Sequence, residues 1–443
     1  MLSWDGALAG RRGGSPLRRV GRRAALAGAA ALVAGVGATL LQGMESARAS
    51  RLPTPPLTLL VGSGVGPTEP PFAAQAAAAL VGAFRAQEPA ARVRISVARS
   101  TLVQVATAML SGRDGAADLI LVPPAVRDLP NAGVLMHSLT PTLRATGVGA
   151  GVYPSLLTYC SAGGRLLSAP LFRDPLVVYY NVDAFARAGV PALPGDWTLQ
   201  GFMNVCRLLA GPRTRPVPHP LATAVGRFDA ELLGAFIAGF GGGLGPADLD
   251  GLASPAGVRG VEALLTLHAF EPETPVPSPR DLFATAGAAM YFGHQRDLAY
   301  LTTAIGDLFA WNVASLPRFP ARAAVPVQAQ GIAVVTGQPV RRPEATALAL
   351  FGVTASAQAA AAPTGAGVPS LRALAASALW RATMPPVDLS VFVRHPEADL
   401  VIPPALWTMV PLQRALRQCL QGTPPAEALA AARAALALAP WGP

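Results

Sequence analysis

The feature that most constrains the fold is a regular alternation of strands and helices near the N-terminus. Apolar runs of strand length alternate with helical periodicity in the order Leu57–Gly62, Phe72–Gln87, Arg92–Ala98, Leu102–Leu110 and Asp118–Val122. Strands joined by helices at this spacing form right-handed crossovers and a largely parallel sheet. The pattern therefore predicts an α/β fold, in which ligands gather at the carboxyl ends of strands.

The rest of the chain is mixed. Leu166–Tyr180 is extended but interrupted by Pro170 and Pro175, and two further extended runs cover Trp311–Leu316 and Gly331–Thr336. A helical tail starts at Trp407. The other expected helices are Val182–Ala188, Leu199–Leu209, Asp229–Phe240, Val258–Phe270, Pro279–Ala288 and Pro425–Leu438.

Composition narrows the class of protein. The 443 residues suffice for two or three domains of about 150 residues each, and 51% hydrophobic residues exclude a disordered chain. All 35 basic residues are arginine, and the net charge of +10 is divided equally between residues 1–49 and the rest. A charge of +5 spread without clusters over the remaining chain is not the pattern of a nucleic-acid-binding protein.

The first 49 residues resemble an export signal. Arg18, Arg19, Arg22 and Arg23 precede an uncharged run from Ala24 to Leu41, and Ala47-Arg48-Ala49 fits a signal-peptidase site. The paired arginines before a weakly apolar run resemble a twin-arginine signal. The alternative is an uncleaved anchor helix, which would be the chain's one contact with a membrane. Either way, the body of the chain is expected to be exported, in the periplasm or at the cell surface.

Known catalytic and metal-binding patterns do not occur. Cys160, Cys206 and Cys419 are widely spaced, which favours buried thiols, although one disulfide is possible. No Cys/His spacing fits a metal site, and neither a nucleophile elbow nor a His-Glu-x-x-His motif is present. No metal and no cofactor are expected.

Seven segments in the same order resemble motifs of the family 1 extracellular solute-binding proteins, the maltose-binding-protein-like receptors of ABC importers. The longest runs from Leu166 to Val190 and contains Tyr179-Tyr180-Asn181, similar to the "YYNKDLFEKAG" signature. The others are Asp196–Thr198, Ala286–Gly293, Val313–Pro317, Gly331–Val335, Pro343–Ala347 and Gly422–Ala432. The likeness extends from about Leu57 to the C-terminus.

This resemblance implies a two-lobe periplasmic-binding-protein fold of type II, with hinge-linked lobes and a ligand cleft between them. Lobe 1 would comprise residues 50–170 and 318–355, and lobe 2 residues 171–317 and 356–443. It further implies a monomeric receptor that closes over a carbohydrate or related polyhydroxylated solute and delivers it to the permease subunits of an ABC importer, without catalysis.

The ligand-binding residues that the resemblance and the strand ends suggest fall into two groups. Loop residues at strand ends are Ser63, Gly64 and Pro124, and Trp407 occupies a family position where an aromatic ring stacks on sugar, with a buried core role as the alternative. Residues near the hinge and the cleft are Arg173, Asp174, Phe240, Gly241, His294, Gln295, Arg296, Gln328 and Gln330.

Two of these positions carry alternatives. Arg173 and Asp174 could contact ligand or form an interlobe ion pair. Arg296 stands where the family has a tryptophan, and an arginine there could stack on a sugar, pair with an anionic group or be solvated at a helix start. Arg296 and Arg173 together would bias the ligand toward a sugar acid or a phosphorylated polyol. Two other functions remain open at this stage: an exported carbohydrate-active hydrolase with two carboxylates across a cleft, and a receptor-like sensor or interaction module that does not import.

Overall fold

The structure is a computed structural model of residues 1–443. It describes residues 55–62, 72–98, 117–122, 132–190, 193, 197–211, 218–222, 229–272, 278–336, 341–381, 387–402 and 405–438. The proposed export signal, the predicted helix over 102–110, and Ser63, Gly64 and Pro124 lie outside these ranges.

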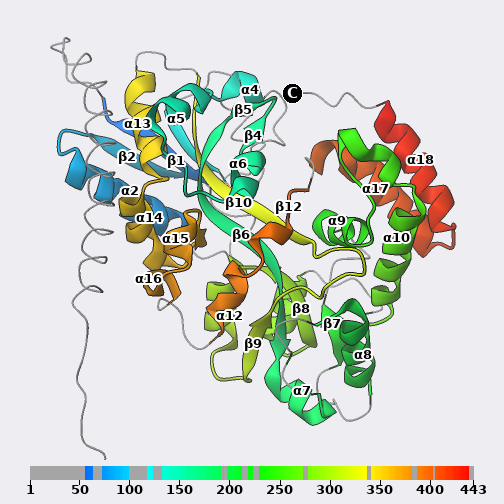
Figure 1. The fold of residues 1–443 in the computed structure, drawn as a ribbon. Helices are drawn as coiled ribbons and strands as arrows, with labels where there is room; N and C mark the ends of the chain where they lie inside the picture. The colour runs from blue at the N-terminus through cyan, green and yellow to red at the C-terminus, as the bar shows by residue number, and fades with distance from the viewer. Residues whose placement is uncertain are drawn as a thin grey trace, which may run out of the picture. The chain divides into compact units, whose positions relative to one another are not determined.

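The first part of the sheet confirms the parallel alternation. β1 (Leu57–Gly62) pairs in parallel with β2 (Val93–Ala98) on one side and with β3 (Leu119–Val122) on the other. The crossover helix α2 (Phe72–Gln87) has the predicted bounds and buries Leu80, Val81 and Phe84. In Figure 1, α2 lies beside α14 (Ala355–Ala361), against which it packs.

The sheet then changes direction. β10 (Val325–Val334) runs antiparallel to β3 and to β6 (Ser168–Asn181), so the strand order is β2-β1-β3-β10-β6-β8-β7. The expectation of a largely parallel sheet therefore holds for β1, β2 and β3, whereas β10 pairs antiparallel with both of its long neighbours.

The predicted interruption of the extended segment at its two prolines is wrong. β6 is one continuous strand of 14 buried residues. Its ladder with β10 shifts register between Gln330 and Gly331, opposite Phe172 and Pro170, which leaves one extra residue on β6. A bulge accommodates a proline that has no N–H to donate. Pro175 lies where β6 leaves β10 and begins to pair with β8.

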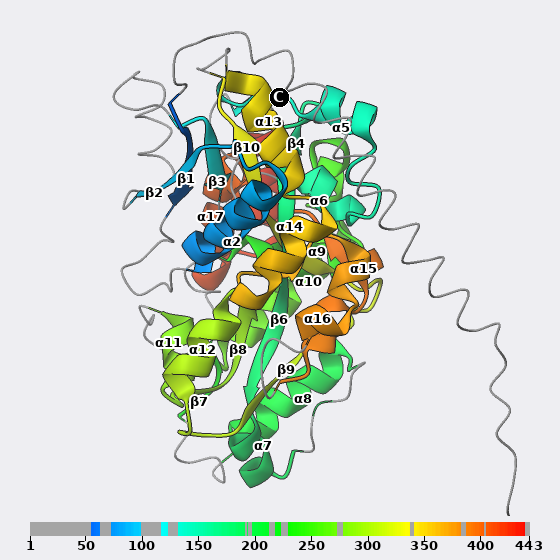
Figure 2. The same cartoon turned by 90° about the vertical axis from the view of Figure 1, so that its left-hand side faces the viewer.

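β6 connects the two parts of the sheet. Its residues 168–175 pair with β10, and residues 176–181 pair with β8 (Ala288–His294) and β9 (Trp311–Ala314). β7 (His219–Ala222) adds to β8 in parallel. Both views show the strand extending between these parts (Figure 1, Figure 2). β8 corrects the expectation of a helix reaching Ala288: α11 ends at Ala284, and the apolar run that follows it forms a buried strand.

Helices enclose the second part of the sheet. α7 (Val182–Ala188) and α8 (Leu199–Leu209) have the predicted bounds, and α9 covers Ala230–Gly239. Capping side chains set these starts, since Asn181, Thr198 and Asp229 each accept a backbone N–H from the first turn. The other helices here are α10 (Pro255–His268), α11 (Pro279–Ala284), α12 (Asp297–Ile305), α17 (Ala405–Leu420) and α18 (Pro425–Ala437).

The remaining elements are short or cover the first part of the sheet. Among helices they are α4 (Ala132–Leu135), α5 (Thr140–Thr146), α6 (Pro154–Tyr159), α13 (Arg342–Phe351), α15 (Arg372–Ala375) and α16 (Ala378–Arg381). Short 3-10 segments cover Pro246–Gly251, which is kinked at Asp248, and Ala362–Thr364, Leu389–Val393 and Pro396–Ala398. β4 (Ser161–Ala162) and β5 (Arg165–Leu166) form a hairpin, while β11 (Val368–Pro369) and β12 (Asp399–Leu400) join β6 and β10.

A core cluster of the described residues lies around β6, β8, α8, α9 and α10. Cys160 and Cys206 are buried, as expected, and Cys206 and the half-buried Cys419 are free thiols. Among the described residues no single helix has the length and apolarity to cross a membrane, although the bent pair 342–351 and 355–364 together meets those criteria.

Candidate functional site

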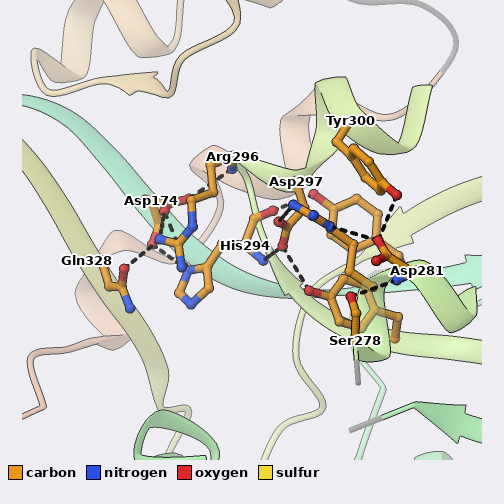
Figure 3. A network of polar contacts seen from close by, with 11 residues as sticks. Asp174, Ser278, Asp281, His294, Arg296, Asp297, Tyr300 and Gln328 are labelled. Atoms are coloured by element: carbon orange, nitrogen blue, oxygen red, sulfur yellow. Dashed lines mark hydrogen bonds and ion pairs between the residues drawn. The ribbon is translucent and has the colours of Figure 1, made fainter. Parts of the chain in front are cut away.

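A buried polar cluster forms where β6 passes from β10 to β8. The turn His294-Gln295-Arg296 connects the end of β8 to the start of α12. Figure 3 shows the side chains of His294 and Arg296 reaching Asp174 and Gln328, which come from β6 and β10. Predicted site residues separated by more than a hundred positions in the sequence are thus brought together.

Arg296 is the cation at one side of this cluster. Its Nη1 lies 2.5 Å from Asp174 Oδ2 and donates to Gln328 Oε1 at 2.6 Å, and its backbone N–H donates to Asp174 Oδ1 at 3.1 Å. The Arg296 side chain is 35% exposed, whereas that of Asp174 is 3% exposed. The buried carboxylate is therefore satisfied by a bidentate contact with the start of α12.

His294 pairs with a carboxylate that the sequence reasoning missed. Its Nε2 lies 2.6 Å from Glu231 Oε2, and its Nδ1 lies 3.2 Å from the backbone oxygen of Asp174. Gln328 Nε2 donates to the other oxygen of Glu231 at 2.8 Å, which closes a ring of contacts. Burial lowers the pKa of His294, but the charge and hydrogen bond of Glu231 together with the charge of Asp174 raise it by more, so the pKa is about 9.

Glu231 lies in the first turn of α9. The helix starts at this point because Asp229 accepts backbone N–H groups from Glu231 and Leu232. Burial raises the pKa of Glu231, but the positive charges of His294 and Arg296 lower it by a larger amount in total, so its pKa lies below the ordinary value. Burial, followed by the charge of Glu231, raises the pKa of Asp229. The sequence signal for Glu231 was its place in the first turn of a predicted helix, where a negative side chain interacts favourably with the helix dipole.

Arg173 has a different environment from its neighbour Asp174, because successive strand residues point to opposite faces. Its guanidinium is fully buried and makes a bidentate contact with Asp399 of β12. Nη1 also donates to the Phe392 oxygen at 2.5 Å, and the group lies over the Tyr153 ring. Arg173 therefore forms an ion pair that does not face the cluster. It is not the interlobe pair expected as the alternative, because Arg173 and Asp399 both belong to the residues expected to form lobe 2.

The other predicted residues are distributed differently. Gln295 and Gln330 each have a buried amide oxygen for which the described residues supply no hydrogen-bond partner, and Gln295 Nε2 donates to the Gly365 oxygen at 3.5 Å. Phe240 and Gly241 follow the far end of α9, about 13 Å along the helix from Glu231. Trp407 belongs to α17, but its side chain lies outside the described set.

The described residues hold no group of three or more His, Cys, Asp or Glu side chains that could bind a metal ion. The chemistry of the cluster is hydrogen bonding: two carboxylates, one imidazolium, one guanidinium and one amide are held in fixed positions. Such an arrangement suits recognition of a polar small molecule.

Comparison with solved structures defines the class of the fold. An ABC substrate-binding protein from Listeria monocytogenes in complex with cycloalternan is similar with a TM-score of 0.70 and 16% identity, over 87% of this chain and 98% of that one. The GacH receptor of Streptomyces glaucescens, solved unliganded and with acarbose, gives a TM-score of 0.68 and 16% identity over 86% of this chain and 97% of that one. UgpB from Mycobacterium tuberculosis with glycerophosphocholine gives 0.68 and 19% over 87% and 98%. The fold is the mixed α/β fold of type II periplasmic solute-binding proteins.

The sequence profile of the bacterial extracellular solute-binding protein family matches residues 67–361. The chain belongs to this family, which confirms the resemblance seen in its motifs. It is a solute-binding protein of the type that serves ABC importers, and its family is one of non-catalytic receptors. No curated protein sequence is significantly similar to the chain.

Proposed function

We propose that this protein captures a neutral carbohydrate or related polyhydroxylated solute at the polar cluster and delivers it to an ABC importer. The observation that supports this most is the convergence of Asp174, Glu231, His294, Arg296 and Gln328 from four elements. Vicinal hydroxyl groups are donors and acceptors at once, and paired carboxylates, cations and amides complement both roles.

We propose that a ligand enters the cluster where Gln328 of β10 meets Glu231 and Arg296, because these are the contacts that a lobe rotation would separate. Asp174, His294 and Gln295 are all less than 7% exposed, so the site is closed. We propose that the lobes are residues 50–170 with 318–355 and residues 171–317 with 356–443, and that they rotate about β6 and β10. Closure over a solute that contacts both lobes would then shift the population toward the closed state.

The internal ion pairs bear on ligand charge. Arg296 holds Asp174, and Arg173 holds Asp399 on the opposite face of β6. The anionic bias expected from these two arginines therefore loses its basis, since neither offers an uncompensated charge. Removing a carboxylate from its cation to admit an anion would leave a buried charge unpaired, which is costly. A neutral polyhydroxylated solute avoids this cost.

The neighbours are consistent with this class of ligand, because two of those described above were solved with a cyclic oligosaccharide and with acarbose. UgpB, solved with glycerophosphocholine, supplies the competing chemistry of a phosphodiester. Export, presentation to a permease and a monomeric state are part of the same proposal, and they rest on the family and on the signal-like N-terminus.

A thermal-shift screen tests the proposal. The panel contains maltotetraose, cycloalternan, acarbose, sugar acids, polyols and glycerophosphocholine. A ligand present at 100 times its Kd stabilises the folded state by about 2.7 kcal/mol. We expect neutral oligosaccharides or polyols to give the shift, and a shift confined to the anionic compounds would contradict the neutral assignment. Hydrolysis of a glycoside in the same samples would favour the hydrolase alternative.

A matched pair of variants links binding to the cluster. Glu231→Gln removes the charge that holds His294, whereas Glu262→Gln makes the same change on the exposed face of α10. We expect the first to weaken binding of the hit at least tenfold and the second to leave it unchanged. Urea unfolding of the ligand-free variants separates lost binding from lost stability. Equal affinities for the two variants would place the ligand elsewhere.

A further inference from the structure

The turn His294-Gln295-Arg296 is held in place by hydrogen bonds to its backbone. Both backbone groups of His294 are hydrogen-bonded: its N–H donates to Asp297 Oδ2 at 2.9 Å, and its oxygen accepts from the Tyr179 hydroxyl at 2.6 Å. The N–H of Leu298 donates to the Gln295 oxygen at 3.0 Å and closes the turn. None of these contacts uses the side chains that face Asp174, Glu231 and Gln328.

Asp297 is the centre of this second layer. It is the first residue of the nine-residue helix α12 and is 8% exposed. The same oxygen that accepts from His294 also accepts from the Tyr291 hydroxyl at 3.0 Å, and Arg280 Nη1 lies 3.7 Å from the other oxygen. Figure 3 shows this layer on the side of His294 away from Gln328. The carboxylate thus accepts two hydrogen bonds at one oxygen and has a cation near the other, which restrains its position.

The two tyrosines are permanent donors in this layer. The rings of Tyr179 and Tyr291 stack with centroids 5.9 Å apart, and burial, followed by the charge of Asp297, raises the pKa of both hydroxyls well above 10. Gly293 completes the arrangement, because a Cβ there would lie 2.3 Å from the Tyr291 ring and 2.9 Å from Asp297 Oδ2. The layer therefore requires this glycine.

We propose that Asp297 is a positioning residue of the solute site: by accepting the His294 N–H, it fixes the turn that places His294 against Glu231 and Arg296 against Asp174. This inference rests on the proposed function, although it can be tested without any solute. If the turn is freed, the His294 imidazole loses its fixed contact with Glu231, and Arg296 loses its alignment with Asp174.

The experiment measures the titration of His294 by histidine-labelled NMR in the ligand-free protein, with the signal assigned from His294→Gln. The groups that face the ring are Glu231, Asp174, Arg296 and, at the start of α9, Asp229. In the native protein we expect a pKa of about 9. Asp297→Ala removes both the acceptor and a negative charge, whereas Asp297→Asn removes the charge alone and retains an acceptor oxygen.

We expect Asp297→Ala to lower the proton affinity of His294 at least tenfold more than Asp297→Asn does. Equal titrations in the two variants would overturn the proposal, because the charge and not the position would then explain any change. If Asp297→Ala does not fold, Tyr179→Phe removes the opposite contact of the His294 backbone. A native-like titration of His294 in Tyr179→Phe would also contradict the proposal that hydrogen bonds to the His294 backbone fix the turn.

A second readout uses the solute. Affinity for maltotetraose should fall in Asp297→Ala and be restored in Asp297→Asn. If maltotetraose and the other compounds of the screen bind to no form of the protein, the proposed function fails, while the histidine titration still decides the role of Asp297.

Discussion

The ion pair between His294 and Glu231 predicts how the stability of the protein depends on pH. The pKa of His294 is raised from 6.5 to about 9, and at 1.36 kcal/mol per pKa unit this amounts to about 3 kcal/mol in favour of the folded, charged form. Because the folded pKa is the higher one, this stabilisation is fully present below pH 6.5 and is lost as the pH rises through 9. His294→Gln removes the titrating group.

The assay is urea unfolding of the native protein and of His294→Gln at several values between pH 6 and pH 10. We expect the free energy of unfolding of the native protein to exceed that of the variant by about 3 kcal/mol at pH 6, and the difference to close toward pH 10. Taking the difference cancels groups common to both chains, such as Cys206, whose pKa burial raises.

His268→Gln is the matched control. His268 also lies next to a carboxylate, 2.7 Å from Glu271, but its side chain is 41% exposed. Exposed ion pairs contribute about 0–1 kcal/mol, so this variant should follow the native profile closely. If His294→Gln and the native protein lose stability in parallel from pH 6 to pH 10, the ion pair is not the source of the dependence, and the reasoning is refuted.

Two further substitutions test the packing around the site. Arg173→Met leaves Asp399 buried without its cation and should lower the free energy of unfolding, measured in urea, by about 3–5 kcal/mol. The control Arg433→Met removes an exposed ion pair and should lower it by less than about 1 kcal/mol. Similar losses in the two variants would show that burial does not decide the strength of the pair. Gly293→Ala would place a Cβ 2.3 Å from the Tyr291 ring and should lower the melting temperature. The control Gly82→Ala adds a Cβ on helix α2 that meets nothing within 4 Å and should stabilise the protein by about 0.5–1 kcal/mol. An unchanged melting temperature for Gly293→Ala would contradict the close packing of Gly293 against Tyr291 and Asp297.

Several members of the polar cluster could be named from the sequence singly, but their contacts with one another could not. Asp174, His294, Gln295, Arg296 and Gln328 were all expected near the cleft from the family-like motifs. Which carboxylate would meet which cation depends on how β6, β8 and β10 pair. Period-2 alternation implies opposite faces for Arg173 and Asp174, but only the neighbouring strands decide that one face holds Asp399 and the other holds Arg296.

Secondary structure divides in the same way. The bounds of α2, α7 and α8 follow from local periodicity and capping, which the sequence contains. β8 and the uninterrupted β6 do not, because an apolar run after a helix and a strand with two prolines are ambiguous until a partner strand is present.

The sequence by itself determined the α/β class, the starts of α2, α7, α8, α11 and α18, and the family, since these depend on interactions between residues close in the chain or on collinear motifs. The tertiary structure alone decided three features: the antiparallel pairing of β10 with β3 and β6, the pairing of His294 with Glu231, and the hydrogen bond from the His294 N–H to Asp297. These features join distant segments, more than 200 residues apart in the case of β3 and β10. Their energies come from burial and charge that exist only once the chain has folded.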